Sequence, residues 1–481
     1  MINISISRVD GLPAKELDQL TRLIDVFRDH QGANAIKNKY YEGHVTLGDV
    51  NLGIALPHGF RGLEIGCAWG AKCVDVLASR SMFDGFVAED GTDAGAMHAI
   101  LLDNNLVYEY GKACRDELKY GCTFATLSHG GTSGVRIRWH TPQTAAAIWD
   151  GERDAIECGF AIISVDEDSK TKVPIVKILN LYTPDATWVI RHVHNSDYVA
   201  ERVPHALEEP LMVPFIWNAT SEKPFGRSRL KKSIRELING YVRTVANATI
   251  GLEFATSPQK YLLGVTDDQY DAVVSQKFRQ YIGSIIASTT NPETGEKPSF
   301  GQLTQGNIQP HVDMIRILAT QFSAATGLSV TEVGVVNDAN PTSSEAILAQ
   351  SQTLVTMAEQ LNASNGNALR KVALLAQAIA ADVTVDALAD HQRNILAHFK
   401  NPAMPSVSVT ADAAIKIASS RAEFASTDTF LEMIGFSQAD IRRIKAQEQR
   451  VRGQALLTEV LSDDDIGPGL GELREPAIET E

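Results

Sequence analysis

The chain has 481 residues, of which 44% are hydrophobic and 21% are charged. This length can bury a sizeable core, and the composition is that of a folded soluble protein. The formal net charge is −15. A protein that grips nucleic acid by neutralising phosphates needs a basic excess, so the charge argues against tight sequence-nonspecific DNA binding. An acidic surface would still suit a protein that DNA must pass without sticking.

The sequence shows no pattern for a membrane span, a secretion signal or a metal site. No apolar run is long enough to cross a bilayer, and the N-terminus lacks a basic segment followed by an apolar one, so we expect the chain to start in the cytoplasm of its cell. His192 and His194 share one face of an expected strand without a Cys or carboxylate pattern nearby. We expect buried or idle reduced thiols at the five cysteines, Cys67, Cys73, Cys114, Cys122 and Cys158.

Helical and strand patterns are segregated along the chain, which indicates the α+β class. Apolar residues at helical spacing predict a first helix around 17–27, and a polar, turn-rich stretch follows at 38–57. Helical patterns return at about 66–80 and 94–118. Alternating runs separated by glycine-rich and polar turns predict an antiparallel β region over about 122–217.

The next part of the chain is mainly helical. An apolar stripe predicts a helix from about Phe225 to 253, and KYLLGV at 260–265 is a short strand candidate. The helix at 309–326 has the clearest pattern in the chain. Pro310 can open this helix and Gly327 can close it.

Helical pattern also dominates the C-terminal part. Residues Thr342–Glu345 have the spacing of a capping box, which predicts the start of a long helix that ends near 381. An edge strand is expected at 394–399, and helices are expected from 411 to about 461. The last residues, 463–481, are acidic and poor in core-forming side chains, and we expect an exposed or partner-ordered tail.

Residues 63–70, LEIGCAWG, look like the cofactor loop of S-adenosylmethionine-dependent methyltransferases. That loop needs a buried strand before it and alternating strands and helices after it. Here a proline, a histidine, an arginine and two glycines precede the motif, one helix follows it, and Ala68 replaces the usual second glycine. The common hydrolase, phosphate-binding and zinc-protease motifs are also missing. We therefore expect no catalytic residue, no cofactor and no metal, and the methyltransferase stays as the alternative from another class.

A series of short motifs in a fixed order resembles the portal (head-to-tail connector) proteins of tailed double-stranded-DNA bacteriophages, especially those of long-tailed actinobacterial phages. The series covers most of the chain. It consists of NKYYEG, LGIALP, AWGAKCVDVLASRSMFDGF, LYTPD, PFGRSRL, SPQKYLLG, FGQLTQGNIQPHVDMIRILATQFSAATGL, NPTSSEAI and HFKNPAMPS. Each fragment is short, but the ordered series is specific. The resemblance implies that the region around Trp69 and Asp75 is a helix and not a cofactor loop.

The resemblance implies a portal fold with wing, stem, clip and crown, which assembles as a ring, typically of twelve subunits, around an axial channel. It divides the chain into a wing at 1–226 (N-terminal helices and antiparallel β region), a first stem helix at 227–253, a clip at 254–308, a second stem helix at 309–326, a tunnel loop at 327–344, a long helix and return to the wing at 345–406, a crown at 407–462 and an acidic C-terminal tail at 463–481.

The resemblance also implies a location and a set of partners. The ring would occupy one vertex of the capsid in the virion, after assembly in the host cytoplasm. Double-stranded DNA would pass through the channel during packaging and ejection without sequence-specific binding. The clip would dock the terminase large subunit and later a head-completion or adaptor protein, and the wing would meet the major capsid and scaffold proteins. No membrane partner is expected.

The expected tunnel loop contains neither Lys nor Arg. This suits a channel in which DNA slides, because phosphate-binding cations would trap it. Glu332 and Asp338 would instead repel the DNA backbone weakly. An exposed loop of a globular domain is the alternative. The expected channel-lining residues are Thr331, Glu332, Asn337, Asp338 and Asn340.

A basic patch is expected at the start of the first stem helix. It comprises Arg227, Arg229, Lys231, Lys232 and Arg235. Cations at a helix N-terminus oppose the macrodipole, so they need another role. The acidic total favours pairing with acidic wing residues of a neighbouring subunit. Loose contact with DNA and a merely solvated face stay open.

Both expected stem helices carry one apolar stripe, which suits neighbours packed side by side in a ring. A helical hairpin in a monomer would show the same periodicity. The sequence as a whole predicts a structural portal ring without catalysis of its own. Another virion assembly protein without an axial channel is the alternative within the structural class.

Overall fold

The chain forms two units, Met1–Ala403 and Met404–Glu481. The computed structural model describes residues 4, 6, 8–48, 62, 64–88, 95–167, 174–194, 197–256, 260–263, 295, 299–302, 307–334, 344–403, 407–436 and 438–462. Both helices and strands are abundant, and the expected α+β class is confirmed.

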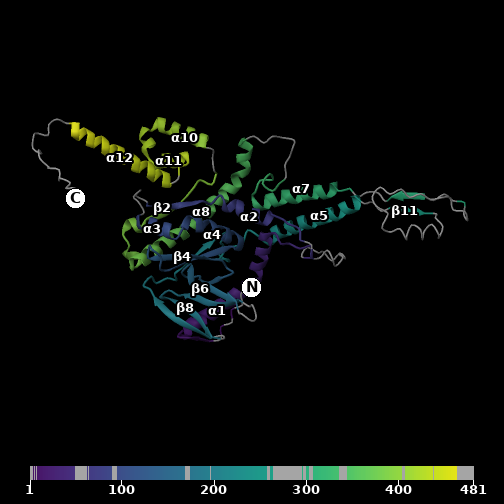
Figure 1. Cartoon of the computed structure of the whole chain (residues 1–481), viewed down its shortest axis with the longest axis horizontal. Coiled ribbons are helices and arrows are strands. Elements are labelled where there is room, and N and C mark those ends of the chain that lie inside the picture. Colours follow the sequence, from purple (N-terminus) through teal and green to yellow (C-terminus); the bar gives the residue numbers. More distant parts are fainter. Residues whose placement is uncertain are drawn as a thin grey trace, which may run out of the picture. The chain divides into compact units, whose positions relative to one another are not determined.

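The first unit contains most of the helices and all described strands (Figure 1). Its elements are β1 (Arg8–Asp10), α1 (Ala14–Glu42), α2 (Trp69–Ala78), β2 (Phe83–Ala88), α3 (Gly95–Asp103), α4 (Leu106–Tyr120), β3 (Cys122–His129), β4 (Val135–His140), β5 (Ala145–Asp150), β6 (Ala155–Glu167), β7 (Pro174–Tyr182), β8 (Ala186–His194), β9 (Asp197–Pro204), β10 (Met212–Ile216), α5 (Lys232–Thr256), β11 (Lys260–Leu263), β12 (Ser299–Gln302), α7 (Gln309–Thr326), α8 (Ser344–Ala381), α9 (Asp390–Arg393) and β13 (Ile395–Phe399).

Helix α1 is longer than its apolar pattern predicts, because residues 38–42, expected in a turn-rich stretch, are helical. It ends where Gly43 adopts the left-handed conformation at φ 78° and donates its N–H to the Lys39 carbonyl. Glycine reaches that conformation without steric cost, so the C-cap fixes the end of the helix.

The single helix expected at 94–118 is two helices, α3 and α4. The break lies at Asn105, whose φ of 48° is left-handed and cannot continue a right-handed helix. The side chain of Asn104 donates to the carbonyls of Ile100 and Val135, and it accepts from the Ile137 N–H at 2.8 Å. These bonds tie the break to β4, which is a tertiary preference that periodicity does not reveal.

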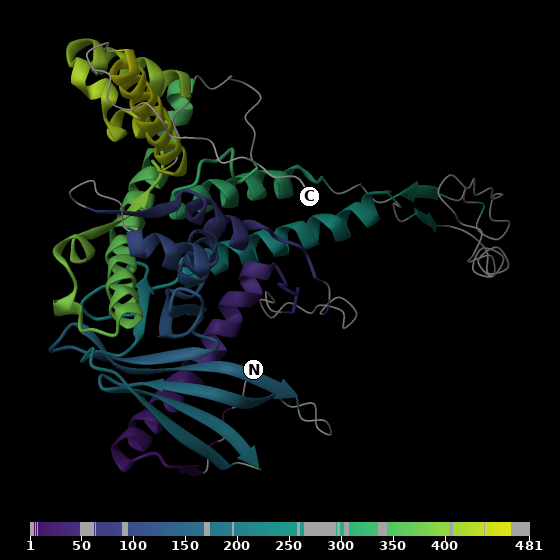
Figure 2. The same cartoon turned by 60° about the vertical axis from the view of Figure 1, so that its left-hand side comes forward.

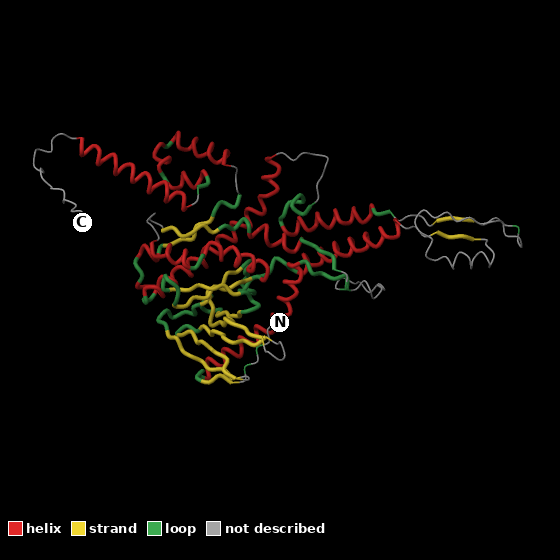
Figure 3. The backbone as a smooth tube through the Cα atoms, viewed as in Figure 1, coloured by secondary structure: helices red, strands yellow, loops and turns green. Residues whose placement is uncertain are grey.

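The long strands form a six-stranded sheet in the order β1-β9-β8-β7-β6-β5. These strands, yellow in Figure 3, gather at one end of the first unit, and α1 lies against the sheet (Figure 2). All neighbouring pairs are antiparallel except β1 with β9. Phe27 of α1 meets Phe160 of β6 edge to face at 5.5 Å between ring centroids. The antiparallel region expected over about 122–217 is confirmed, but it is divided between this layer and a separate antiparallel sheet, β10-β3-β4.

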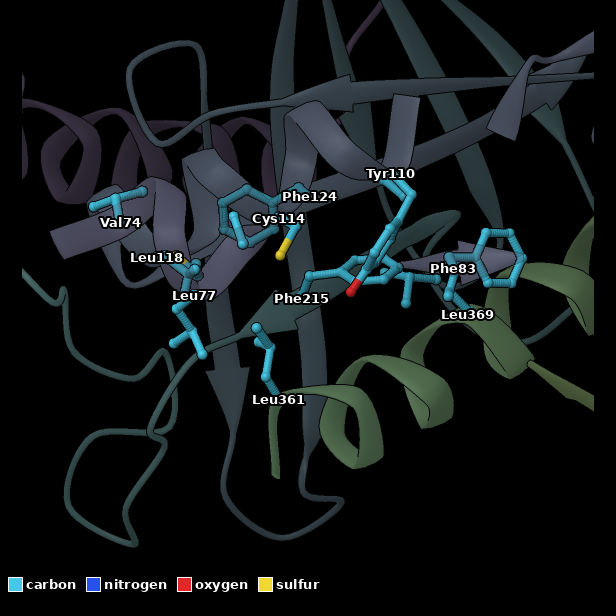
Figure 4. Close-up of a cluster of buried hydrophobic side chains, with 14 of the residues drawn as sticks. Val74, Leu77, Phe83, Tyr110, Cys114, Leu118, Phe124, Phe215, Leu361 and Leu369 are labelled. Atoms are coloured by element: carbon cyan, nitrogen blue, oxygen red, sulfur yellow. The ribbon is translucent and has the colours of Figure 1, made fainter. Parts of the chain in front are cut away.

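A second and larger core joins the three-stranded sheet β10-β3-β4 to helices α2, α4 and α8. The strand expected at 394–399 is confirmed as β13, which pairs with β2. Phe83 of β2 packs on Tyr110 of α4 at 5.7 Å, and Tyr110 packs on Phe215 of β10 at 6.5 Å. Figure 4 shows these rings beside Leu361 and Leu369 of α8. The long helix is thereby held in the centre of the unit.

Polar side chains cross this core at the contact between α4 and α8. Glu117 is fully buried, and its Oε2 accepts a hydrogen bond from Nδ2 of Asn365 at 2.7 Å. The same amide donates to the Tyr110 hydroxyl, which shares a 2.7 Å hydrogen bond with the Ser81 hydroxyl. Burial raises the pKa of Glu117 to about 8, against the opposing effect of Asn365, so the carboxyl is neutral at pH 7.

The five cysteines are free and buried, in agreement with the expected reduced thiols. Burial raises the pKa of Cys67 to about 11 and that of Cys122 to about 12, so both are protonated at neutral pH. Across the described residues, no helix could span a membrane and no group of His, Cys or carboxylate side chains is placed to hold a metal.

The second unit is helical and contains α10 (Val407–Ser420), α11 (Asp428–Ile434) and α12 (Gln438–Ser462). Thr427 caps α11 by accepting from the Phe430 N–H, and Gly435 ends that helix in the left-handed conformation. Phe424 and Phe430 pack edge to face at 5.8 Å. The helical pattern expected over 411–461 is thus confirmed with two breaks. The acidic tail at 463–481 lies outside the described residues.

The burial of Glu117 predicts a pH-dependent stability. Its pKa is about 8 in the folded state and has an ordinary value of 4.5. Between these values only the unfolded chain loses the proton, so the free energy of unfolding falls as the pH rises from about 4.5 to about 8. We expect Glu117→Gln, which still accepts from Asn365, to remove on the order of 2–4 kcal/mol of this fall.

Thermal unfolding from about pH 5 to about pH 9 measures the effect. The matched control is Glu152→Gln, which removes an exposed carboxylate from the turn between β5 and β6. A profile for Glu117→Gln that runs parallel to that of the wild type would contradict the buried neutral carboxyl.

Candidate functional site

Two long helices, α5 and α7, run side by side in opposite directions (Figure 1). Helix α7 has the bounds expected for 309–326, with a proline in its first turn and Gly327 as a left-handed C-cap. Helix α5 begins at Lys232 and not at 227. The preceding residues bond elsewhere: the Ser228 hydroxyl donates to the Lys119 carbonyl at 2.6 Å, and the Arg229 N–H donates to the Leu118 carbonyl.

The two helices are joined by close packing and by one tryptophan. Gly240 of α5 faces Leu318 of α7, where an added Cβ would lie 3.1 Å from a leucine methyl. Trp69, the first residue of α2, stacks on Tyr241 of α5 at 4.5 Å and on Phe322 of α7 at 4.8 Å. Trp69 therefore fixes the distance between both helices and the core.

Gly70 of the methyltransferase-like motif has a packing role, whereas a Cβ on Gly66 would meet nothing within 4 Å. A Cβ on Gly70 would lie 2.0 Å from the Tyr40 carbonyl oxygen, so the end of α1 crosses α2 only at a glycine. Ala68 is right-handed and Trp69 starts the helix directly, while Glu64 forms an isolated bridge with Thr46. The backbone of this motif thus has no phosphate- or cofactor-binding turn in its described residues, and Leu63 lies outside them.

Arg229 is buried and lies at the junction of four segments. Its Nε donates to the Cys73 carbonyl of α2 at 2.6 Å, and one terminal nitrogen donates to the Thr326 carbonyl, the last of α7, at 2.7 Å. The other terminal nitrogen lies 3.5 Å from the Met357 sulfur on α8. The expected place of Arg229 in an exposed basic patch is therefore wrong, because its guanidinium is satisfied inside the subunit.

The rest of the expected basic patch is divided. Arg227, Lys231 and Lys232 are exposed, and Lys231 lines a cavity of about 580 Å³ next to Arg229. Arg235 lies over the ring of Tyr40 at 5.7 Å from its centroid. Three cations are thus available to a partner on this surface. Their role between subunits or toward DNA stays a prediction.

The loop after α7 starts as a compact turn that is fixed to the core. Gly327 has a left-handed φ of 73°, and a Cβ there would lie 2.4 Å from the terminal methyl of Met357, which would have to move. Ser329 and Glu332 bond reciprocally: the Glu332 carboxylate accepts from the Ser329 N–H at 2.8 Å and from its hydroxyl at 3.0 Å, while Ser329 Oγ accepts from the Glu332 N–H. The Lys72 ammonium of α2 donates to the Glu332 carbonyl.

Two of the five expected channel-lining residues lie in the described turn, and the structure gives one of them another role. Thr331 is exposed, but the Glu332 carboxylate is half-buried and bonded within its own turn. The Ser-x-x-Glu spacing of a capping box was present in the sequence and could have revealed this role. The other three residues, Asn337, Asp338 and Asn340, lie outside the described residues, as does Thr342 of the expected capping box.

The excursion between the helices contains one described pair of strands. Lys260–Leu263 (β11) confirms the strand candidate and pairs antiparallel with Ser299–Gln302 (β12). Most residues between the two strands lie outside the described part of the chain. The assignment of this excursion as a clip stays a prediction.

The sequence profile described as "Phage portal protein, SPP1 Gp6-like" matches residues 12–454. The chain therefore belongs to this family of phage portal proteins, and its role is that of a structural portal protein. The family match gives the methyltransferase alternative no support.

Three solved structures are similar over most of the chain. The first is the virion of a native gene transfer agent particle, with 11% identity and a TM-score of 0.43 over 76% of this chain and 89% of that chain. The second is the neck of the native particle with C12 symmetry, with 11% identity and a TM-score of 0.44 over 76% of this chain and 89% of that chain. The third is the neck of the empty particle with C6 symmetry, with 12% identity and a TM-score of 0.45 over 77% of this chain and 90% of that chain. Comparison with curated proteins gives no match.

Arg229 predicts a sharp loss of stability on substitution. Arg229→Ala would remove the charged donor from the Cys73 and Thr326 carbonyls and leave the Thr326 carbonyl, at the end of α7, without this partner, and we expect it to lower the free energy of unfolding by about 3 kcal/mol. Arg227→Ala is the matched control, because Arg227 is exposed two residues away. Chemical denaturation measures both variants. Equal, small effects would show that the buried guanidinium does not stabilise the junction.

Proposed function

We propose that the chain forms a closed ring, of twelve subunits as in the family it resembles, around an axial channel for DNA packaging and ejection. The α5–α7 pair is the stem, and the strands β11 and β12 belong to a clip that docks the terminase large subunit and later an adaptor protein. The wing contacts capsid and scaffold proteins. The chain carries out no catalytic step, and it occupies one vertex of the virion after assembly in the host cytoplasm.

The observation that carries the ring is a second apolar surface on α7. Leu318 and Phe322 are buried, whereas Met314 and Ile317 are 44% and 53% exposed. At 100° per residue, Ile317 lies about 100° from Leu318 and about 140° from Phe322, on another side of the helix, whereas Met314 lies about 40° from Leu318 at the edge of the buried face. A different patch of a second subunit would cover them in a heterologous contact, and such contacts form a ring when the rotation from one subunit to the next closes.

The charge distribution supports a conduit for DNA. The net charge of −15 limits adhesion of DNA to the ring, and the described turn at 328–334 contributes no cation. Exposed Arg227, Lys231 and Lys232 face outward before and at the start of α5, where they suit pairing with acidic residues of a neighbouring subunit.

Ring formation is tested by imaging the purified protein with its mass measured alongside. We expect rings with a central hole in the wild type, and a loss of rings in Ile317→Glu because a charge would be buried between subunits. Val193→Glu is the control, since it places a charge on an exposed apolar residue of β8. Intact rings in Ile317→Glu would place the contact elsewhere, and wild-type protein that forms no rings even with capsid components would contradict the proposal.

The loop after α7 is tested by DNA packaging. We expect Asp338→Lys to reduce the DNA content of particles without affecting ring assembly, since it adds a phosphate-binding cation to each subunit. Glu332→Lys also breaks the turn with Ser329, so Glu332→Gln is its control: the amide still accepts those bonds. Full packaging by both lysine variants would contradict a loop that lines the channel.

A further inference from the structure

Helix α12 carries a second concentration of basic residues in this acidic chain, apart from the one at 227–235. Between residues 442 and 452 there are five cations, Arg442, Arg443, Lys445, Arg450 and Arg452, and one carboxylate, Glu448. At 100° per residue the five cations lie within about 180° of the helix circumference, and Glu448 lies outside that arc. This basic stripe is about 15 Å long, because each residue advances the helix by 1.5 Å.

Most of α12 is not packed against the other described helices of its unit. Ile441 is its one buried residue among those whose burial is described, and the helix extends past α10 and α11 in Figure 1. Helix α12 has 25 residues, and its apolar side chains Val451 and Leu456 are 64% and 61% exposed. Such a helix gains little from its own unit. Its exposed side is therefore available to a partner.

The two ends of the stripe differ in how their charges are compensated. Near the start of α12, Lys445 pairs with Asp428 at 2.6 Å and Arg443 lies 3.9 Å from Asp440. Farther along, Arg450 and Arg452 are exposed, and neither has an ion-pair partner within the described part of the chain. Arg450 and Arg452 lie about 160° apart around the helix, near the two edges of the stripe, so each edge carries one uncompensated arginine that attracts an anionic partner.

We propose that the basic stripe of α12 binds the phosphate backbone of double-stranded DNA, independently of base sequence. Four of its five cations are arginines, whose planar guanidinium matches phosphate in a bidentate manner. A stripe about 15 Å long spans roughly four phosphate steps of one strand. The proposal rests on the proposed function, in which DNA fills the particle that contains this ring.

The test measures DNA binding by the full-length protein. Binding is monitored through the fluorescence anisotropy of a labelled duplex of about 25 base pairs, at roughly 50 to 200 mM salt. We expect Arg450→Gln/Arg452→Gln to weaken binding on the order of tenfold at the lowest salt. We also expect it to reduce the slope of log affinity against log salt by about 1.8, or 0.9 for each lost phosphate contact.

The control removes two equally exposed arginines from the first unit. Arg8→Gln/Arg153→Gln changes the net charge identically, at side chains that are 73% and 74% exposed. Unchanged binding by the α12 variant, or an equal loss in the control, would overturn the proposal. Competition by poly-glutamate as effective as that by DNA would overturn it too, since it would indicate an acidic protein partner.

Ring imaging of the same samples separates the two proposals. Wild-type rings without DNA binding through α12 would refute the stripe and leave the ring intact. DNA binding through α12 by protein that forms no rings would support the stripe and count against the ring.

Discussion

The arrangement of the helical pair depends on one buried guanidinium. Arg229 enters the core without a carboxylate partner and is satisfied by two backbone carbonyls, one of them the last of α7. The C-terminal end of a helix carries partial negative charge, so this carbonyl is a favourable acceptor for a cation. Charge-assisted hydrogen bonds offset the desolvation of the guanidinium. The start of α5, the end of α7 and the middle of α2 are thereby held at one point.

This junction sets the direction in which the loop after α7 starts. Gly327 fits against Met357 of α8, and the Ser323 hydroxyl donates to the Leu328 carbonyl at 2.6 Å. The next turn is held by Ser329 and Glu332 and by Lys72 of α2. On its far side the loop leads into α8, which Asn365 anchors to the buried polar cluster. The described start of the loop therefore leaves from a fixed part of the subunit.

Sequence patterns predicted the long elements well and the junctions poorly. Helix α7 was predicted to the residue, since proline, an apolar stripe and glycine mark its start, face and end. The break at Asn105 and the late start of α5 were missed, because hydrogen bonds to distant strands and helices decide them. Arg229 was placed on the surface for the same reason: its acceptors lie 97 and 156 residues away in the sequence. Composition cannot distinguish a buried arginine from a solvated one.

The charges of the chain are distributed in a way that suits a portal protein. A conduit that attracted DNA along its whole length would hold it in deep electrostatic wells, whereas an acidic chain keeps contacts weak. Concentrated cations then occur in separate places. Arg229 lies inside the subunit, Arg227, Lys231 and Lys232 are exposed near the start of α5, and five more lie on one stripe of α12. In the proposed ring, each of these groups would bind one partner without making the rest of the surface adhesive. Net charge therefore limits how strongly the protein binds DNA overall, while local burial and pairing decide which cations remain free to bind anything.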